Sequence, residues 1–310
     1  MSLNIIHPGL QTTIQDGGRA GNLRWGISCG GAADSFAMAL GNLLLGNPPD
    51  HPGLEVALTG PEIEFTCALS IAVTGAHFDL RLNHETVGND EVITVRAGDR
   101  LRFGPLRSGA RAYIALAAGI QLPILFHSLS THVIAGFGGL HGRPLQGGDQ
   151  IPLQHCRIEP PRALPAAYRL DYSSRPLLRV VHGLEAPYFP AETLARFYRG
   201  GFTVSPQSNR MGIRLQGDPL PVEALPEQVS SALCPGTVQV PPNGQPIISF
   251  VEGQTIGGYP RIAHVISADL HRLGQLVAGA RLDFEVVNRA SAHRTLAGKA
   301  RLLARLPELL

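Results

Sequence analysis

Two arginines and one aspartate stand out because their side chains suit ligand binding and proton transfer. Arg19 and Arg210 each carry a planar guanidinium that can bind a carboxylate through two parallel hydrogen bonds. Asp16 lies three residues before Arg19 and could act as a base or orient another group. These three residues are the candidates for catalysis. The alternative for each arginine is a structural ion pair with a nearby Asp that would hold a loop in place.

Hydroxyl, amide and phenol side chains close to glycines form the candidates for binding a small ligand. They are Ser128, Ser130, Thr131, Asn209, Gln239, Gln254, Thr255 and Tyr259. Gly257 and Gly258 lie among the last three, and the absence of a Cβ would let a ligand approach the backbone there. A plain hairpin turn is the alternative for that segment. Hydroxyls in turns also often bond to their own backbone, which is the alternative for residues 128–131.

The bulk composition argues against several classes of protein. The 26 basic and 24 acidic residues are scattered and leave a net charge of +2, so no surface that binds nucleic acid is expected. The four cysteines are widely separated and the twelve histidines form no ligand set, so we expect no metal and no disulfide framework. The chain shows no leader-like or membrane-spanning apolar run, which predicts a cytoplasmic protein without a membrane segment.

Short apolar runs separated by turn residues predict a mainly β protein with a few short helices. The composition agrees, since 36 Gly and 25 Pro accompany only 16% charged residues. Runs of strand length occupy residues 62–65, 70–74, 91–95, 112–116 and 177–181. Helices are predicted at 34–45, where Asp34 is an N-cap candidate, at 190–199, and in a short turn from residue 269.

The distribution of these runs predicts two β modules. Residues 97–103 (AGDRLRF) return as residues 278–284 (AGARLDF), and each copy predicts a glycine turn that leads into a strand with Leu and Phe on one face. A chance match is the alternative for so short a repeat. Residues 161–176 are rich in proline and have linker composition, so we expect β domains at residues 1–160 and 177–310. Closure into barrels would protect their sheet edges.

Long motifs in a fixed order resemble one known family along nearly the whole chain. They include GLQTTIQDGGR at 9–19, WGIS at 25–28, GNLLLGN at 41–47, SNRMG at 208–212, GTVQVP at 236–241 and QTIGGYP at 254–260. The glycine string GFGGLHG at 136–142 also matches, and it lacks the spacing of a dinucleotide-binding loop, which indicates a tight turn. By these motifs the chain is similar to the family of biotin-dependent carboxyltransferases that includes KipA, the C subunit of 5-oxoprolinase and allophanate hydrolase subunit 2.

The resemblance implies two tandem cyclophilin-like β-barrel domains and a heteromeric enzyme. The first expectation is a subunit of an ATP-dependent 5-oxoprolinase, which converts 5-oxoproline, ATP and water to glutamate, ADP and phosphate. Its partners would be a KipI-like subunit and a LamB/YcsF-like subunit, and ATP need not be bound by this chain. One alternative is the carboxyltransferase of a biotin-dependent system of the urea carboxylase type. Another is a KipA-like regulator that binds a KipI-like kinase inhibitor without doing chemistry.

Five positions depart from the pattern of that family. Two of them, Ala33 in place of Met and Ala278 in place of Pro, are interpreted as packing changes. The family usually has Gly at the position of His127, often a basic residue at that of Leu129, and Asp at that of Glu252. Leu129 removes a possible contact to an anion, and Glu252 moves a carboxylate about one methylene further from the backbone. Both changes bear on which substrate the site would accept.

Overall fold

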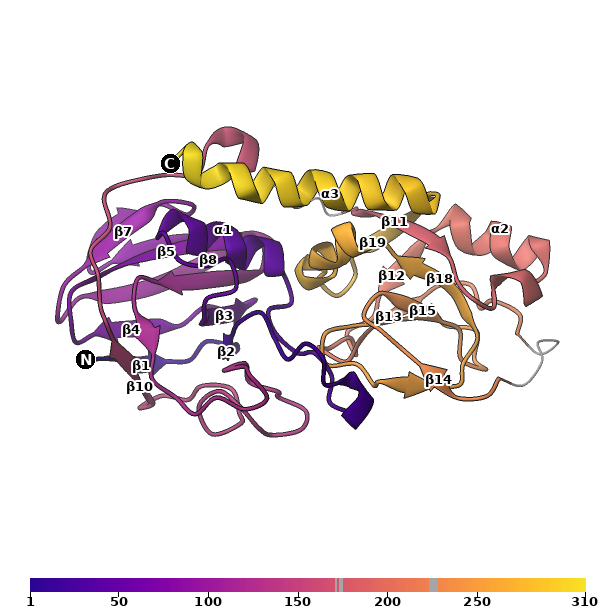
Figure 1. Ribbon diagram of the computed structural model, residues 1–310, viewed down its shortest axis with the longest axis horizontal. Helices are drawn as coiled ribbons and strands as arrows, with labels where there is room; N and C mark the ends of the chain where they lie inside the picture. Colours follow the sequence, from indigo (N-terminus) through magenta and orange to yellow (C-terminus); the bar gives the residue numbers. More distant parts are fainter. Residues whose placement is uncertain (171, 173–174, 223–227) are drawn as a thin grey trace. The chain divides into compact units, whose positions relative to one another are not determined.

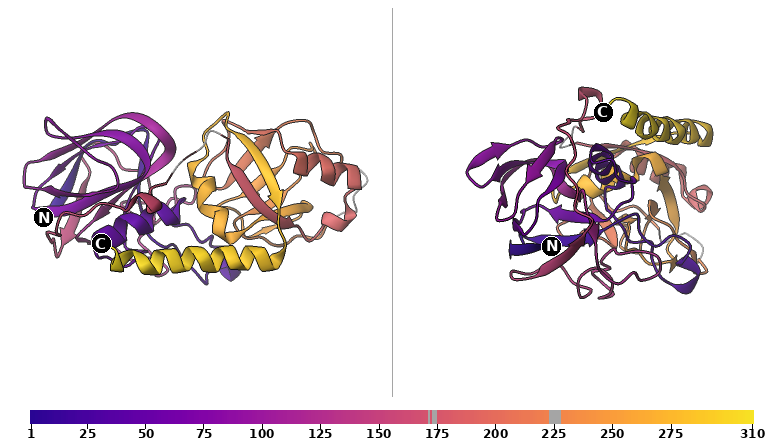
Figure 2. Two further views of the ribbon diagram at one scale, coloured as in Figure 1. Left: turned by 90° about the horizontal axis from the view of Figure 1, so that it is seen from above. Right: turned by 60° about the vertical axis from the view of Figure 1, so that its left-hand side comes forward.

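The computed structural model describes residues 1–170, 172, 175–222 and 228–310. They form two compact units (Figures 1 and 2). Unit 1 contains Met1–Arg19, Gly30–Tyr172 and Leu302–Leu310, and unit 2 contains Ala20–Cys29 and Ser173–Arg301. The predicted linker 161–176 falls partly on residues 171, 173 and 174, which lie outside the described residues. Both units are built mainly from β-strands, and the predicted fold class is confirmed.

Unit 1 is built on a ten-stranded sheet. Its strands are β1 (Ser2–His7), β2 (Gln11–Gln15), β3 (Gly53–Ala57), β4 (Glu62–Phe65), β5 (Leu69–Leu82), β6 (Glu85–Val87), β7 (Val92–Val95), β8 (Arg100–Leu116), β9 (Gly119–Ile120) and β10 (Gln150–Gln154). The order along the sheet is β2-β3-β8-β4-β1-β10-β9, with β5 paired to β8 and both β6 and β7 paired to β5. Alternate apolar side chains such as Leu101 and Phe103 on β8 enter the core, as the first copy of the repeat predicts.

Helix α1 (Ser35–Leu44) confirms the predicted N-terminal helix of unit 1. The Asp34 carboxylate caps it by accepting hydrogen bonds from the backbone N–H groups of Phe36 (3.1 Å) and Ala37 (2.8 Å). The apolar stripe of α1 packs in a cluster that includes Ala72 of β5 and Ala115 of β8. Burial of this stripe, rather than helix propensity alone, holds α1 against the sheet.

Unit 2 is a closed seven-stranded barrel with the order β11-β18-β15-β16-β13-β12-β19 (Figure 2). The strands are β11 (Leu177–His182), β12 (Phe202–Val204), β13 (Gly212–Gln216), β15 (Thr237–Gln239), β16 (Ile247–Ser249), β18 (Arg261–Val265) and β19 (Arg281–Val286). A separate pair is formed by β14 (Ser231–Ala232) and β17 (Ile256–Gly257). On β19 the second copy of the repeat buries Leu282 and Phe284, and the Phe284 ring stacks on Phe197 of α2 (Ala191–Arg199) with centroids 4.6 Å apart.

Two longer helical segments complete the description, besides short 3-10 turns at Leu23–Trp25, Ala166–Tyr168, Ala186–Tyr188 and Leu306–Glu308. A 3-10 segment at Ser267–Gln275 confirms the predicted turn from residue 269. The sequence pattern did not predict α3 (Arg289–Arg305), a helix of 17 residues. None of its residues is buried, so it lacks the apolar stripe by which helices are recognised, although Ala, Leu, Arg and Lys in it are good helix formers. No helix in the described part of the chain is both long and apolar enough to cross a membrane.

Candidate functional site

Asp16 is the centre of a hydrogen-bond cluster in unit 1. It follows β2, and its Oδ1 accepts from the Ser128 Oγ (2.6 Å), from the Ser130 Oγ (2.5 Å) and from the Gly18 N–H (2.8 Å). Its Oδ2 accepts from the Leu129 N–H (2.6 Å). A carboxylate has about four acceptor positions, so these bonds occupy its capacity. The geometry therefore favours a positioning role for Asp16 over that of a base.

Ser128 and Ser130 have their hydroxyls turned to Asp16. Both serines are buried, and the Ser130 Oγ also accepts from the Asp16 N–H (2.9 Å). The Ser128 Oγ accepts from the Ser130 N–H (3.0 Å). Both hydroxyls therefore hold residues 128–130 against the end of β2 and are engaged within the protein.

Arg19 is fully buried in the same unit. Its Nη2 donates to the Ser130 carbonyl, and its guanidinium lies 4.8 Å from the centre of the Phe137 ring. Two glycines make room for it. A Cβ on Gly138 would collide with Arg19 Nη2, and one on Gly30 would lie 3.1 Å from Nη1. The burial places Arg19 beneath the loop that carries Phe137, so a ligand reaches its guanidinium only if that loop moves.

The segment 124–142 explains two features of the sequence. Leu125 and Ser128 exchange backbone hydrogen bonds around Phe126 and His127, which both have positive φ, at 53° and 64°. This is the geometry of a two-residue type I′ turn, where glycine is favoured. Leu129 is buried in the core, and its backbone N–H, not its side chain, reaches the Asp16 carboxylate. The exchange at position 129 thus changes the core and leaves that hydrogen bond in place.

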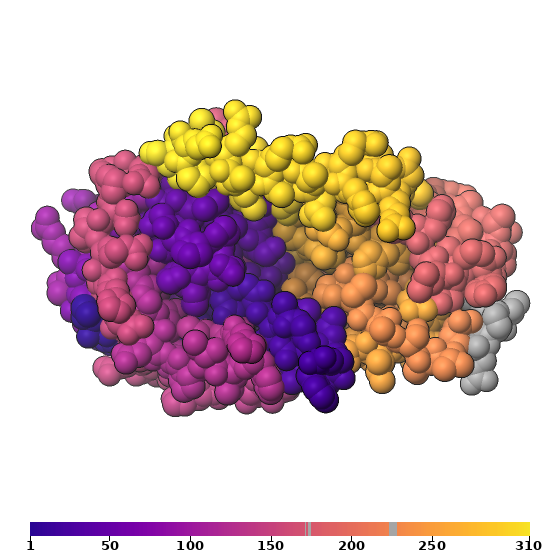
Figure 3. Space-filling model, viewed as in Figure 1, coloured from indigo at the N-terminus to yellow at the C-terminus, as the bar shows by residue number. Residues whose placement is uncertain are grey.

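The glycine string after Thr131 forms successive turns, as predicted. Gly136, Gly138, Gly139 and Gly142 all have positive φ, between 53° and 72°. The segment closes on itself through bonds from the His132 N–H to the Phe137 carbonyl (2.8 Å) and from the Gly142 N–H to the Gly138 carbonyl (2.9 Å). The loops between β9 and β10 that contain it lie at the surface of unit 1, in magenta in Figures 1 and 3.

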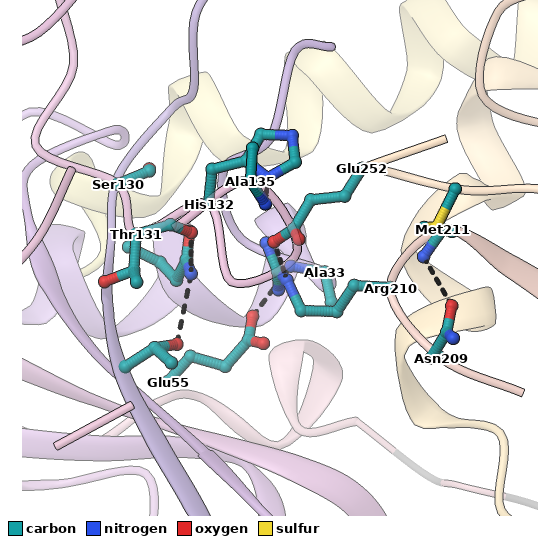
Figure 4. A network of polar contacts seen from close by, with 12 residues as sticks. Ala33, Glu55, Ser130, Thr131, His132, Ala135, Asn209, Arg210, Met211 and Glu252 are labelled. Atoms are coloured by element: carbon teal, nitrogen blue, oxygen red, sulfur yellow. Dashed lines mark hydrogen bonds and ion pairs between the residues drawn. The ribbon is translucent and has the colours of Figure 1, made fainter. Parts of the chain in front are cut away.

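Unit 1 contains a buried hydrogen-bond network of a carboxylate and a phenol that the sequence pattern did not predict. Glu55 Oε2 accepts from the Ala33 N–H and from the Tyr113 hydroxyl, each at 2.8 Å, and the first bond is drawn in Figure 4. The Tyr113 oxygen accepts from the Asp34 N–H (2.7 Å). Burial, with the charges of Glu55 and Asp34, raises the pKa of Tyr113 well above its usual value. The sequence signal that could have indicated this network is a single Glu in the apolar run GLEVA at 53–57.

Arg210 and Glu252 form an ion pair inside unit 2 (Figure 4). Both are buried, and Arg210 Nε donates to Glu252 Oε1, while the Glu252 N–H donates to the Arg210 carbonyl (2.8 Å). Next to them the Asn209 Oδ1 accepts from the Met211 N–H (2.8 Å), so Asn209 stabilises the turn before β13. The partner of Arg210 is thus a Glu distant in sequence, at one of the positions that depart from the family pattern.

The remaining candidates gather around Gly257 in unit 2. A Cβ on Gly257 would lie 2.8 Å from Gln254 Nε2 and 3.0 Å from Gln239 Nε2, so the glycine lets both amides approach the backbone. Gln239 Nε2 donates to the Tyr259 carbonyl (3.3 Å), and the Tyr259 side chain is 46% exposed. The Thr255 carbonyl accepts from Leu233, which places Thr255 in the same β14–β17 segment.

The predicted residues therefore form separate groups in the two units. Unit 1 brings together Asp16, Arg19, Ser128, Ser130 and Thr131. Unit 2 brings together Asn209 and Arg210, and also Gln239, Gln254 and Tyr259 around Gly257. In unit 1 the arrangement offers a buried guanidinium and backbone groups held by hydroxyls and a carboxylate. Such a set can bind an anionic or amide group without moving a proton itself.

Residues 25–286 match the model of a known family, described as the carboxyltransferase domain, subdomain A and B. The chain belongs to this family. It is 40% identical to the 5-oxoprolinase C subunit of Escherichia coli K12 over 282 residues, which cover 91% of this chain and 90% of that protein. It is 37% identical to the 5-oxoprolinase C subunit of Haemophilus influenzae, with 94% and 93% covered.

A solved structure shows the same fold as part of a longer chain. The Kluyveromyces lactis urea carboxylase superposes with a TM-score of 0.92 at 26% identity, covering 98% of this chain. This chain spans only 29% of the length of that carboxylase. The family fold therefore occurs both as a nearly complete subunit and as one portion of a multidomain enzyme.

Proposed function

We propose that this chain is the C subunit of an ATP-dependent 5-oxoprolinase. The observation that carries the proposal is the match to two proteins of that name over at least 90% of both chains. Its partners would be a KipI-like and a LamB/YcsF-like subunit, and the complex would convert 5-oxoproline, ATP and water to glutamate, ADP and phosphate. In this role the chain contributes binding groups to a lactam-opening site that the partners help to form.

The proposal assigns ATP to one of the partner proteins. Helix N-termini bind phosphate through free N–H groups, but at α1 two of these groups are engaged by the Asp34 carboxylate, whose charge would repel a phosphate. The glycine string 136–142 runs through turns and is not followed by a helix. These features support a division of labour in which this chain handles the organic substrate.

A second candidate is the carboxyltransferase of a biotin-dependent system. It is supported by the family to which the chain belongs and by the likeness to the urea carboxylase of Kluyveromyces lactis. That reading requires a carboxylated biotin on a carrier protein and a urea-like acceptor. The third expectation, a regulator without chemistry, requires only that this chain bind a KipI-like protein.

Reconstitution of the three purified proteins separates these functions. The proposal expects ATP hydrolysis that depends on 5-oxoproline, needs all three proteins, forms glutamate and is insensitive to avidin. Hydrolysis that avidin abolishes, and that depends on urea, bicarbonate and a biotin carboxylase with its carrier, would favour the second candidate. A tight complex that turns over neither substrate, and that persists after Arg19→Ala and Arg210→Ala, would refute both enzymatic readings and support the regulator.

A further inference from the structure

Two buried oxygen acceptors lie beside Arg19 in unit 1. They are the Gln15 Oε1 and the Thr131 Oγ1, and both residues are fully buried. Within the part of the chain that the structure describes, neither atom has a hydrogen-bond partner. Leaving a buried polar atom unsatisfied costs about 1–3 kcal/mol. Such atoms are rare in folded proteins, and two on neighbouring residues call for a functional explanation.

Hydrogen bonds hold the side-chain amide of Gln15 and the backbone of Thr131. Gln15 Nε2 donates to the Thr13 Oγ1 and to the Thr131 carbonyl, each at 3.0 Å. The Thr131 N–H in turn donates to the Ile14 carbonyl (2.8 Å). The Gln15 amide is therefore oriented with its oxygen away from these acceptors. Thr131 and Ser130 are drawn in Figure 4.

The glycine turns at residues 132–142, which we call the flap, cover these acceptors. A Cβ on Gly139 would collide with the Thr131 Oγ1, so the flap backbone rests directly on that hydroxyl. The Gly139 N–H donates to the Leu129 carbonyl (2.9 Å), and Phe137 of the flap lies over the Arg19 guanidinium. Leu140 anchors the flap in the core of unit 1, while the flap's glycines tolerate large backbone changes, as hinge segments do.

We propose that the Thr131 Oγ1 and the Gln15 Oε1 accept the N–H of the lactam substrate when the flap opens, while Arg19 binds its carboxylate. The inference rests on the proposed function and deepens it. A Cβ on Gly138 would collide with Arg19 Nη2 and one on Gly139 with the Thr131 Oγ1, so the guanidinium and this hydroxyl lie under neighbouring residues of the flap. Gln15 joins them through its bond to the Thr131 carbonyl. A compound that carries a carboxylate and a ring N–H next to each other matches this pair of complementary groups.

The variant Thr131→Val tests the proposal because it removes the hydroxyl and keeps the shape of the side chain. In the reconstituted complex we expect KM for 5-oxoproline to rise about five-fold, as the loss of one neutral hydrogen bond predicts. The melting temperature of the variant should stay equal to the wild type or rise, because an unsatisfied hydroxyl is removed. An unchanged KM in an active complex overturns the proposal.

Thr12→Val is the matched control on the same strand as Gln15. Thr12 is equally buried, but its Oγ1 donates to the Pro8 carbonyl (2.6 Å), and its side chain points to the opposite face of β2 from Gln15. We expect this variant to lose thermal stability and to keep its KM. If Thr12→Val raises KM as much as Thr131→Val does, the effect is general and the proposal is overturned.

A substrate analogue gives a second measurement, on the wild type and on Thr131→Val. The lactone 5-oxotetrahydrofuran-2-carboxylate has a ring oxygen where 5-oxoproline has its N–H. The wild-type complex should bind the lactone more weakly than 5-oxoproline. In Thr131→Val the ratio of the two affinities should be about five-fold smaller. Equal binding of lactone and lactam by an active wild type overturns the inference alone. A wild-type complex without 5-oxoproline turnover instead overturns the proposed function.

Discussion

Replacing Asp16 by Asn should destabilise unit 1 strongly. The substitution keeps the size of the side chain, removes its charge and turns one of its two oxygens into an NH₂ group. Four donors point at these oxygens: the hydroxyls of Ser128 and Ser130 and the N–H groups of Gly18 and Leu129. Whichever way the amide turns, at least one donor faces the NH₂ group and loses its acceptor.

The magnitude follows from the less damaging of the two orientations. With the amide oxygen at the Oδ1 position, three hydrogen bonds remain but lose the strength that a charged acceptor gives, about 1 kcal/mol each at most. The buried Leu129 N–H is then unsatisfied, at about 1–3 kcal/mol. We therefore expect a loss of about 4 kcal/mol in the free energy of unfolding, which lowers the melting temperature of a unit of this size by roughly 10 °C.

Thermal unfolding followed by circular dichroism measures this effect, and Asp34→Asn is its matched control. Asp34 is more deeply buried than Asp16 and lies in the same unit. Its Oδ1 caps α1, where Asn serves about as well as Asp, and its Oδ2 accepts a long hydrogen bond from the Tyr172 hydroxyl (3.4 Å). The control should lose less than about 1 kcal/mol. If the melting temperatures of the two variants lie within roughly 3 °C of each other, Asp16 does not organise the cluster and the reasoning is refuted.

Three further predictions test other features of the two units. His127→Gly should stabilise the protein by about 0.5–1 kcal/mol because glycine adopts the positive φ of this position without strain. The control His84→Gly, at an exposed position with negative φ, should destabilise the protein. Urea unfolding measures both changes. Burial and the neighbouring Cys67 thiol raise the pKa of Cys156 to about 11, and the two sulfur atoms lie 3.3 Å apart. Alkylation of Cys156 should therefore be slow at pH 7.5 and accelerate up to pH 11. Equal alkylation rates for Cys156 and the exposed Cys234 at pH 7.5 would contradict this prediction. Burial lowers the pKa of His264, so the unfolded chain binds a proton at this residue more readily than the folded chain does. The stability of unit 2 should therefore fall as the pH drops below about 6.5. His264→Asn should weaken this pH dependence, and a variant whose stability depends on pH as the wild type's does would exclude His264 as the source.

The strands were predictable from the sequence because their signal is local. In β4, β7 and β11 the apolar residues that mark the strand lie within a few positions of each other. Burial of one face of a strand requires only this local pattern. The cap of α1 was predictable for the same reason, since the partners of Asp34 lie two and three residues away. Helix α3 was not predicted because it buries no residue and therefore lacks the periodic apolar pattern that indicates a helix.

The functions of the site residues depend on contacts that no local pattern contains. Asp16 and Ser130 are 114 residues apart, and Arg210 and Glu252 are 42 residues apart. The motifs identified these residues as important but could not assign partners to them. The sequence therefore left Asp16 as either a base or an orienting group, and the four donors around it favour the second role. Gln15 lies in the motif at 9–19, but a single Gln in a strand carries no signal of its own, and only the structure shows the unsatisfied oxygen of its amide.

The Asp16 cluster and the free acceptors are connected through residues 128–131. Asp16 binds Ser128, Leu129 and Ser130, and these bonds set the position of Thr131 against Gln15. An unsatisfied acceptor persists only where its surroundings prevent it from relaxing, and this cluster supplies that rigidity. Asp16→Asn should therefore weaken binding of the lactam N–H even at temperatures where the variant stays folded. A variant that kept the wild-type KM at such a temperature would show that the two features are independent.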